Sequence, residues 1–372
     1  MTGFGVYSVG GGAPRVGFRA GDDVFDLSGL GEVFRRPSLN DFMAQGPAAW
    51  EDALGQALDG GLPHVPLADV TPALPFEVAD YADFSSSLEH AENMGRLFRP
   101  DGADALHPNW RWLPIAYHGR AGTVVVSGTD VVRPCGELRP ATEGEAPVYA
   151  PTRRLDIELE LGFVVGAPSG RGRPVPTHAF ADHVFGAVLL NDWSARDVQA
   201  WESVPLGPFL GKSFLTSISA WVTPLALLEP LRVEAPLQDP PPLPHLAGGR
   251  DWALDLDLEI ELNGAVVSRG NARTLYWTPP QQLAHATANG ASLRTGDLIG
   301  TGTISGRGRG SEGSLMELSR AGAEPIRLPD GSERSFLEDG DEVVLRARGG
   351  EVELGEVRGT ILPAETAHGS RS

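Results

Sequence analysis

Alternating acidic residues in the segment 155–165 (LDIELELGFVV) could form a metal site. In a β-strand, this alternation places Asp156, Glu158 and Glu160 on one face, where same-face neighbours lie roughly 6.6–7 Å apart. Carboxylates at this spacing can converge on one hard cation. The segment 254–262 (LDLDLEIEL) has the same alternation, and either strand could equally be a solvated face. The pattern therefore leaves two candidate metal strands.

A second polar segment, 191–213 (NDWSARDVQAWESVPLGPFLGKS), begins directly after the apolar run VFGAVLL. Asp192 is its first acidic residue, and Arg196, Gln199 and Lys212 follow. An arginine, an amide and a lysine are groups that hold a carboxylate or stabilise an enolate oxyanion. Arg196 and Gln199 are three residues apart and share a face if the segment is helical. Taken singly, each could also be an ordinary exposed polar residue.

A candidate general base lies in the segment 83–99 (DFSSSLEHAENMGRLFR). Asp83 is a possible acidic ligand, His90 follows seven residues later, and Arg99 follows nine residues after that. Histidine is the side chain best suited to general base chemistry near neutral pH. A single histidine on a helix can also be a packing or surface residue.

Two glycine-containing segments add further polar groups. Tyr117 lies in a loop before a predicted strand, and Thr303 and Glu317 lie in the segment 300–319. Glycine-rich backbone allows close approach to a ligand. Within this segment, 307–314 (RGRGSEGS) could be a mobile lid or a plain surface loop.

The elements that must position these groups are mostly short strands. Glycine (47 residues) and proline (31 residues) exceed a fifth of the 372-residue chain, which is typical of a β-rich fold with many turns. Hydrophobic spacing predicts a helix over 39–59, and another over 85–98 with Ser85, Ser86 or Ser87 as its N-cap. The proline-rich stretch 62–78 is predicted to be a linker. The predicted strands are 4–7, 15–18, 24–27, 122–127, 155–165, 184–190, 254–262 and 351–357.

Composition narrows the class of protein. The length suits two domains. A net charge of -19 argues against nucleic-acid and anionic-membrane partners, because phosphate binding needs clustered Lys and Arg. The single cysteine, Cys135, excludes an intramolecular disulfide, and we find neither a signal peptide nor an apolar run of about 20 residues. These features favour a reducing cytoplasm.

Six motifs, taken in order, resemble the signatures of the fumarylacetoacetase family, and the resemblance runs from about residue 80 to 345. The family has a long two-domain form, to which this length corresponds. One of the six is NDWSARDVQAWESVPLGPFLGKSF, whose parts NDWSARD and PLGPFLGKSF are the most specific. The others are DFSSSLEHAENMGRLFR, LPIAYHGRAGTVVVSGT, LDIELELGFVVG, and GTGTISG with GSLMELS.

The resemblance implies a mainly β (α+β) fold in two domains. Residues 1–75 would form a small SH3-like barrel, and residues 76–365 a catalytic mixed β-sandwich roll of the fumarylacetoacetase type. It also implies a homodimer and a small-molecule diketo acid as the substrate.

The same resemblance assigns roles to individual residues. It implies an Mg²⁺ or Ca²⁺ site and so favours the strand at 155–161 over its competitor. The carboxylate ligands would be Asp83, Glu158, Glu160 and Asp192, with Lys212 and Thr216 close to the metal. The catalytic residues would be His90, Glu317, Arg196, Gln199 and Lys212. The substrate would be held by Arg99, Tyr117, Gln199 and Thr303, with Ser85 and Ser203 in its pocket.

In the implied reaction, His90, oriented by Glu317, takes a proton from the water that attacks a carbonyl of 4-fumarylacetoacetate. The products are fumarate and acetoacetate, in the final step of tyrosine and phenylalanine catabolism. Ser85 and Ser203 stand where the family usually has tyrosine, and Leu215 where it tends to have glycine. These departures leave open a related hydrolase or decarboxylase that acts on a different 1,3-diketo or 2-oxo acid. A non-catalytic protein on the same fold is the third alternative.

Overall fold

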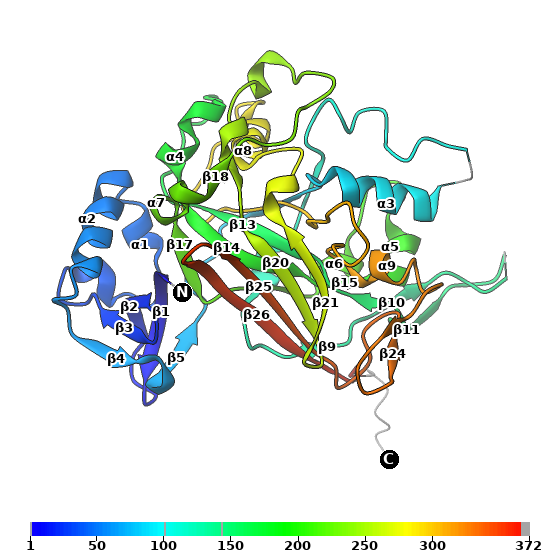
Figure 1. Ribbon diagram of the computed structural model, residues 1–372, viewed down its shortest axis with the longest axis horizontal. Coiled ribbons are helices and arrows are strands. Elements are labelled where there is room, and N and C mark those ends of the chain that lie inside the picture. The colour runs from blue at the N-terminus through cyan, green and yellow to red at the C-terminus, as the bar shows by residue number, and fades with distance from the viewer. Residues whose placement is uncertain (1, 100–101, 143, 366–372) are drawn as a thin grey trace.

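Strands dominate the computed structural model, which describes residues 2–99, 102–142 and 144–365 (Figure 1). The expected mainly β class is therefore confirmed. The largest sheet has 13 strands among these residues, and its central strands carry the polar segments identified above. Along its main path the order is β4 (His64–Pro66), β3 (Asp23–Asp26), β2 (Arg15–Ala20), β1 (Thr2–Val9), β17 (Trp221–Pro224), β14 (Val184–Asp192), β13 (Leu159–Val165), β22 (Leu298–Gly300), β6 (Tyr81–Phe84) and β7 (Ala116–His118). Branches add β5 (Val70–Ala73), β16 (Thr216–Ile218) and β8 (Val124–Val126).

A second sheet of five strands packs against the large one (Figure 1). The main hydrophobic core lies between them, with Phe163 and Leu189 on the large sheet and Ile260 and Leu345 on the smaller one. The order of the smaller sheet is β21 (Ala265–Asn271), β20 (Asp257–Leu262), β25 (Glu342–Gly349), β26 (Val352–Leu362) and β9 (Val131–Val132).

The central strand β14 is buried along its whole length because it contacts two cores. Leu189 faces the core between the two sheets. Phe185 and Leu190 face a second core, which β14 shares with N-terminal residues such as Phe4 and Phe42. Burial on both faces explains the uninterrupted apolar run that precedes Asp192. That carboxylate thus ends a strand that is fixed from both sides.

The N-terminal strands are continuous with the rest of the large sheet, since β1 pairs with β17 through Phe4 and Val222. The predicted helix over 39–59 is interrupted at Gly46, so two helices form, α1 (Asn40–Met43) and α2 (Pro47–Leu58). Proline 47 starts the second helix, where its missing N–H is not needed.

The predicted linker over 62–78 was wrong: it contains β4 and β5, which pair with β3 and β1. Two of its four prolines, Pro66 and Pro72, lie in these short strands, where alternation is too brief to read. The SH3-like barrel is not confirmed, and the division at residue 75 stays a prediction.

The remaining elements are short. Helix α3 (Leu88–Phe98) begins at the cap Ser87, one of the three serines expected there. The predicted strand 155–165 is divided into β12 (Leu155–Asp156) and β13.

No helix within the described residues is long and apolar enough to cross a membrane. The other strands are β10 (Cys135–Leu138), β11 (Val148–Pro151), β15 (Ser194–Ala195), β18 (Arg232–Val233), β19 (Ala253–Leu254), β23 (Ile326–Arg327) and β24 (Glu333–Arg334), and the other helices are α4 (Phe180–His183), α5 (Arg196–Glu202), α6 (Leu210–Ser213), α7 (Leu225–Leu228), α8 (Pro279–Thr287) and α9 (Leu315–Leu318).

Candidate active site

Four carboxylates converge where the ends of neighbouring strands meet. Asp83 comes from β6, Glu160 from β13, Asp192 from the end of β14, and Glu158 from the irregular residues between β12 and β13. One oxygen of each lies within 4.8 Å of the others, and all four side chains are buried. Gly300 lies between Asp83 and Glu160; a Cβ atom there would come within 2.8 Å and 3.1 Å of their oxygens. A glycine at this position leaves room for the two carboxylates.

The electrostatics of this cluster suit a cation. Burial, and then the neighbouring carboxylates, raise the pKa of Asp83 to about 7 and the pKa of Glu160 well above its ordinary value. Burial and Glu158 likewise raise the pKa of Asp192. Asp83 Oδ1 and Glu160 Oε1 are buried without a hydrogen-bond partner. An all-oxygen, electron-rich set of this kind fits a hard divalent cation.

The second acidic strand has a different role. Its acidic residues Glu259 and Glu261 form ion pairs with Arg269 at 3.0 Å and Arg346 at 2.6 Å. Among the described residues, the four carboxylates above are the one group whose ligand atoms could surround an ion. The acidic side chains Glu259 and Glu261 at 254–262 therefore form ion pairs and not a metal site.

Two buried cations border the cluster. Lys212 Nζ donates to Asp192 at 2.8 Å and also to Glu158. Arg196 donates to Glu158 at 2.7 Å. Burial works against the charged form of Lys212, but Asp192 and Glu158 outweigh it, so the pKa of Lys212 is raised. Lys212 is therefore a charged donor beside the carboxylates.

Two hydroxyl groups also contact the cluster through Asp192. Thr216 Oγ1 donates to Asp192 Oδ1 at 3.1 Å, and the Tyr117 hydroxyl donates to Asp192 Oδ2 at 2.7 Å. Both oxygens of Asp192 are thus fixed in orientation.

His90 and Glu317 form a hydrogen-bonded pair. His90 Nδ1 lies 2.8 Å from Glu317 Oε2, and Ser87 Oγ caps the helix at the His90 N–H. Burial works to raise the pKa of Glu317, but His90 and neighbouring hydrogen bonds outweigh it, so this pKa is lowered. Since Nδ1 faces the carboxylate, Nε2 is the ring nitrogen left for chemistry in the cavity.

A cavity of about 530 Å³ joins the two groups. The Arg196 Nη2 and Thr303 Oγ1 atoms are buried there without a hydrogen-bond partner in the protein, so they are available as donors to a substrate. Much of the remaining lining is apolar. The cavity contains the predicted residues Asp83, Ser85, His90, Arg99, Tyr117, Glu158, Arg196, Gln199, Lys212 and Thr303, and its apolar lining contains Met94, Phe98, Leu106, Trp110, Ile115 and Leu206.

The other predicted residues do not line this cavity. Asp192 and Glu317 contact the lining residues Lys212 and His90, respectively. Glu160 belongs to the carboxylate cluster, and Thr216 contacts Asp192. The Ser203 hydroxyl donates to the Gln199 carbonyl at 2.5 Å. Ser203 can therefore affect the site only through its neighbours.

Alternation predicted Asp156 on the same face as Glu158 and Glu160, which was wrong, and no role was predicted for Ser314. Asp156 lies outside the acidic cluster: it accepts from Arg196 Nε at 2.8 Å and from the backbone N–H groups of Leu315 and Met316. The break between β12 and β13 explains this change of face. Ser314 donates to Glu317, and the S-x-x-E spacing of a capping box could have indicated it.

Comparisons with known proteins agree with this geometry. A family model described as fumarylacetoacetate hydrolase C-terminal matches residues 80–362. The chain is 44% identical to fumarylacetoacetase of Arabidopsis thaliana, covering 94% of this chain and 92% of the relative. It is 43% identical to fumarylacetoacetase of Homo sapiens, covering 97% and 95% respectively.

Solved structures share the fold at low sequence identity. A fumarylacetoacetate hydrolase from Exiguobacterium antarcticum matches with a TM-score of 0.61 and 17% identity, covering 98% of this chain and 100% of the other. A maleylpyruvate hydrolase from Sphingobium sp. SYK-6 matches with a TM-score of 0.56 and 18% identity over the same shares.

Proposed function

Since this chain belongs to the fumarylacetoacetate hydrolase family, we infer that it hydrolyses the carbon–carbon bond of 4-fumarylacetoacetate to give fumarate and acetoacetate. This reaction is the final step of tyrosine and phenylalanine catabolism. The observation that carries the inference is the buried carboxylate cluster, of which Asp83 and Glu158 line the same cavity as His90, the partner of Glu317. The curated relatives named above are fumarylacetoacetases, so they favour this substrate over a different diketo acid.

We propose that the cluster holds Mg²⁺ or Ca²⁺ through its four carboxylates, Asp83, Glu158, Glu160 and Asp192. When bound, such an ion would supply Lewis-acid polarisation of the diketo oxygens. Lys212 supports the cluster by holding two of these carboxylates in place.

His90 is the proposed general base. Its Nε2 takes a proton from water, and the water oxygen bonds to the carbonyl carbon beside the bond that breaks. Glu317 holds the Nδ1 proton and stabilises the imidazolium that forms. The electron pair of the breaking bond leaves with the acetoacetate half as an enolate, which accepts from the His90 imidazolium the proton that His90 took from water.

Donors around the cavity stabilise the negative charge that develops. Arg196, Gln199 and Lys212 face the cavity and suit the oxyanion of the attacked carbonyl. Arg99, Tyr117 and Thr303 supply donors for the substrate carboxylates and oxygens, and Ser85 adds a hydroxyl at the wall. Ser203 acts indirectly, by holding the Gln199 backbone.

The test follows the absorbance of fumarylacetoacetate with chelator-treated protein, alone and after addition of Mg²⁺ or Ca²⁺. We expect rapid loss that depends on the added ion. A stable absorbance with an ion demonstrably bound would contradict the substrate assignment and would direct attention to other diketo acids. Loss at the same rate in excess chelator would contradict the metal requirement.

We also propose that the protein acts in the cytoplasm as a homodimer. Exposed large apolar side chains gather in the segment 201–210, which also contributes the rim of the cavity. Concentrated apolar surface of this kind commonly marks a protein interface. These side chains are Trp201, Val204, Leu206, Phe209 and Leu210.

Replacing Val204 with aspartate should weaken the dimer, because the charge would be buried on association. Val204 is 86% exposed and does not line the cavity, so the chain itself should still fold. Leu237→Asp is a matched control, since Leu237 is 80% exposed in a different loop. Sedimentation should show wild type and control at twice the chain mass of 39.4 kDa, and Val204→Asp shifted toward monomer. Equal shifts in both variants would contradict this interface.

A further inference from the structure

The Glu317 carboxylate is surrounded by neutral hydrogen-bond donors that the reaction scheme does not use. We infer that Asn93 is a positioning residue, which fixes Glu317 against His90; this inference rests on the roles proposed above for that pair. Asn93 Nδ2 donates to Glu317 Oε1 at 2.9 Å, while His90 Nδ1 contacts Glu317 Oε2 at 2.8 Å.

Asn93 is distinguished from the other donors by the element that carries it. His90 and Asn93 are three residues apart on α3, so both project from one helix face toward the same carboxylate. The serine donors Ser305 and Ser314 come from segments outside α3. Asn93 therefore ties Glu317 to the same rigid helix that carries the base.

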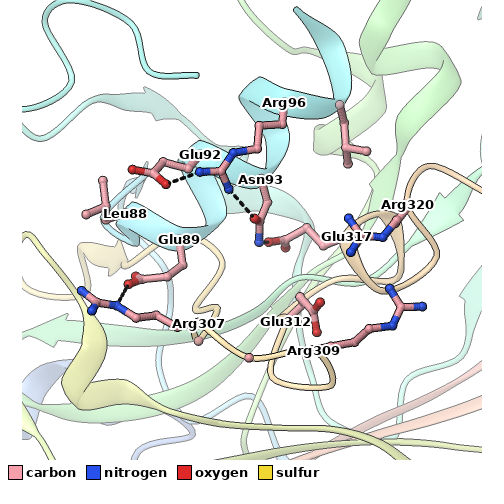
Figure 2. Close-up of a pocket in the computed structure, with 13 residues that line it drawn as sticks. Leu88, Glu89, Glu92, Asn93, Arg96, Arg307, Arg309, Glu312, Glu317 and Arg320 are labelled. Carbon is pink, nitrogen blue, oxygen red and sulfur yellow. Dashed lines mark hydrogen bonds and ion pairs between the residues drawn. The ribbon is translucent and has the colours of Figure 1, made fainter. Parts of the chain in front are cut away.

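A second cavity, of about 510 Å³, lies on the other side of this contact. Figure 2 shows the Asn93 amide turned toward Glu317 at the cavity wall, with Arg96 on the side of its oxygen. Arg96 Nη1 lies 3.5 Å from Asn93 Oδ1, a contact that favours the amide orientation in which the NH₂ group faces the carboxylate. Because this cavity borders Asn93, changing the side chain should disturb the packing little.

The physical role of this donor is to restrict the carboxylate. Ser305 contacts both Glu317 oxygens, and Asn93 adds a donor to Oε1 from the helix that carries His90. The carboxylate is thereby restricted relative to α3, so the His90 ring keeps Nδ1 toward Glu317 and Nε2 toward the cavity. Asn93 is also neutral, so it helps to keep Glu317 ionised without adding a charge that would compete with the imidazolium. An aspartate of the same shape would instead place a second negative charge beside Glu317.

The experiment compares Asn93→Ala and Asn93→Asp, each alone and combined with Glu317→Gln, using kcat and KM for fumarylacetoacetate. We expect kcat to fall by about tenfold in Asn93→Ala and further in the isosteric Asn93→Asp, with KM nearly unchanged. In the Glu317→Gln background, Asn93→Ala should change kcat by less than about twofold, because its route of action is already removed. The control is Glu89→Gln, on the same helix and cavity wall but paired with Arg307, and it should match wild type.

The outcomes separate this inference from the proposed roles. A slow Glu317→Gln enzyme with normal Asn93→Ala and Asn93→Asp would overturn the inference alone. A Glu317→Gln enzyme as fast as wild type would overturn both. Imidazole ¹⁵N NMR is a readout that does not depend on turnover: the Nδ1–H signal of His90 should shift or broaden in Asn93→Ala and stay in place in Glu89→Gln. An unchanged signal in Asn93→Ala would count against the positioning role.

Discussion

Replacing His90 with alanine should lower kcat by about 10²–10⁴-fold, the usual contribution of a general base, and leave metal affinity nearly unchanged. The side chain lies on the cavity wall, its Nδ1 is held by Glu317, and it provides none of the four carboxylate oxygens of the cluster. Kinetics with fumarylacetoacetate and calorimetric titration with Mg²⁺ or Ca²⁺ measure the two effects separately.

A second histidine provides the control for this variant. Of the described residues that line the cavity, His107 is the other histidine, and it is exposed. His107→Ala should therefore stay within a few-fold of wild type. Turnover by His90→Ala at a similar level would remove His90 from the role of base.

Replacing Glu160 with glutamine should lower the affinity for metal but raise the stability of the metal-free protein. Metal affinity should fall by about tenfold or more, because a charged ligand is lost. The metal-free protein should become more stable near neutral pH, because Glu160 is fully buried among other carboxylates and one of its oxygens has no partner.

The pH dependence follows from the direction of these pKa shifts. A carboxyl group whose pKa is raised by folding binds its proton more tightly in the folded chain. Stability is therefore lost as the pH rises from the unfolded pKa to the folded one. For Asp83 that window runs from 3.8 to about 7, and for Glu160 it also begins near its ordinary value.

Thermal unfolding in chelator, measured from about pH 4 to pH 7, should thus show a steeper loss of stability in wild type than in Glu160→Gln. Added metal should reverse the loss in wild type. Glu259→Gln, on the ion-paired acidic strand, is the control and should bind metal normally. Wild-type metal affinity in Glu160→Gln would exclude Glu160 from the site.

Much of this architecture could be predicted from local sequence. The strand ending at Asp192 is visible as an apolar run, and Ser87 caps α3 within the predicted group of serines. The single long helix over 39–59 was mispredicted because a proline such as Pro47 can begin a new helix as well as end one. The linker over 62–78 was mispredicted because the short strands β4 and β5 show little alternation.

The candidate site was predictable residue by residue only where a motif resembled the family. Alternation alone could not distinguish two acidic strands, since the difference lies in distant partners: Arg269 and Arg346 neutralise one of them. The same limit applies to Asp156, whose partners Arg196 and the start of α9 are far along the chain. Pairings of this kind depend on the tertiary fold and leave no local signal.

The pairing of β1 with β17 has a consequence for the N-terminal segment as a whole. Without β1, the large sheet would end in an open edge at β17, whose free N–H and C=O groups could pair with another molecule. Phe185, which contacts Phe4, Phe42 and Trp50, would also lose its cover and become exposed. The segment therefore protects the catalytic region from aggregation, and a shortened chain that begins at β6 would be an aggregation-prone fragment instead of a smaller enzyme.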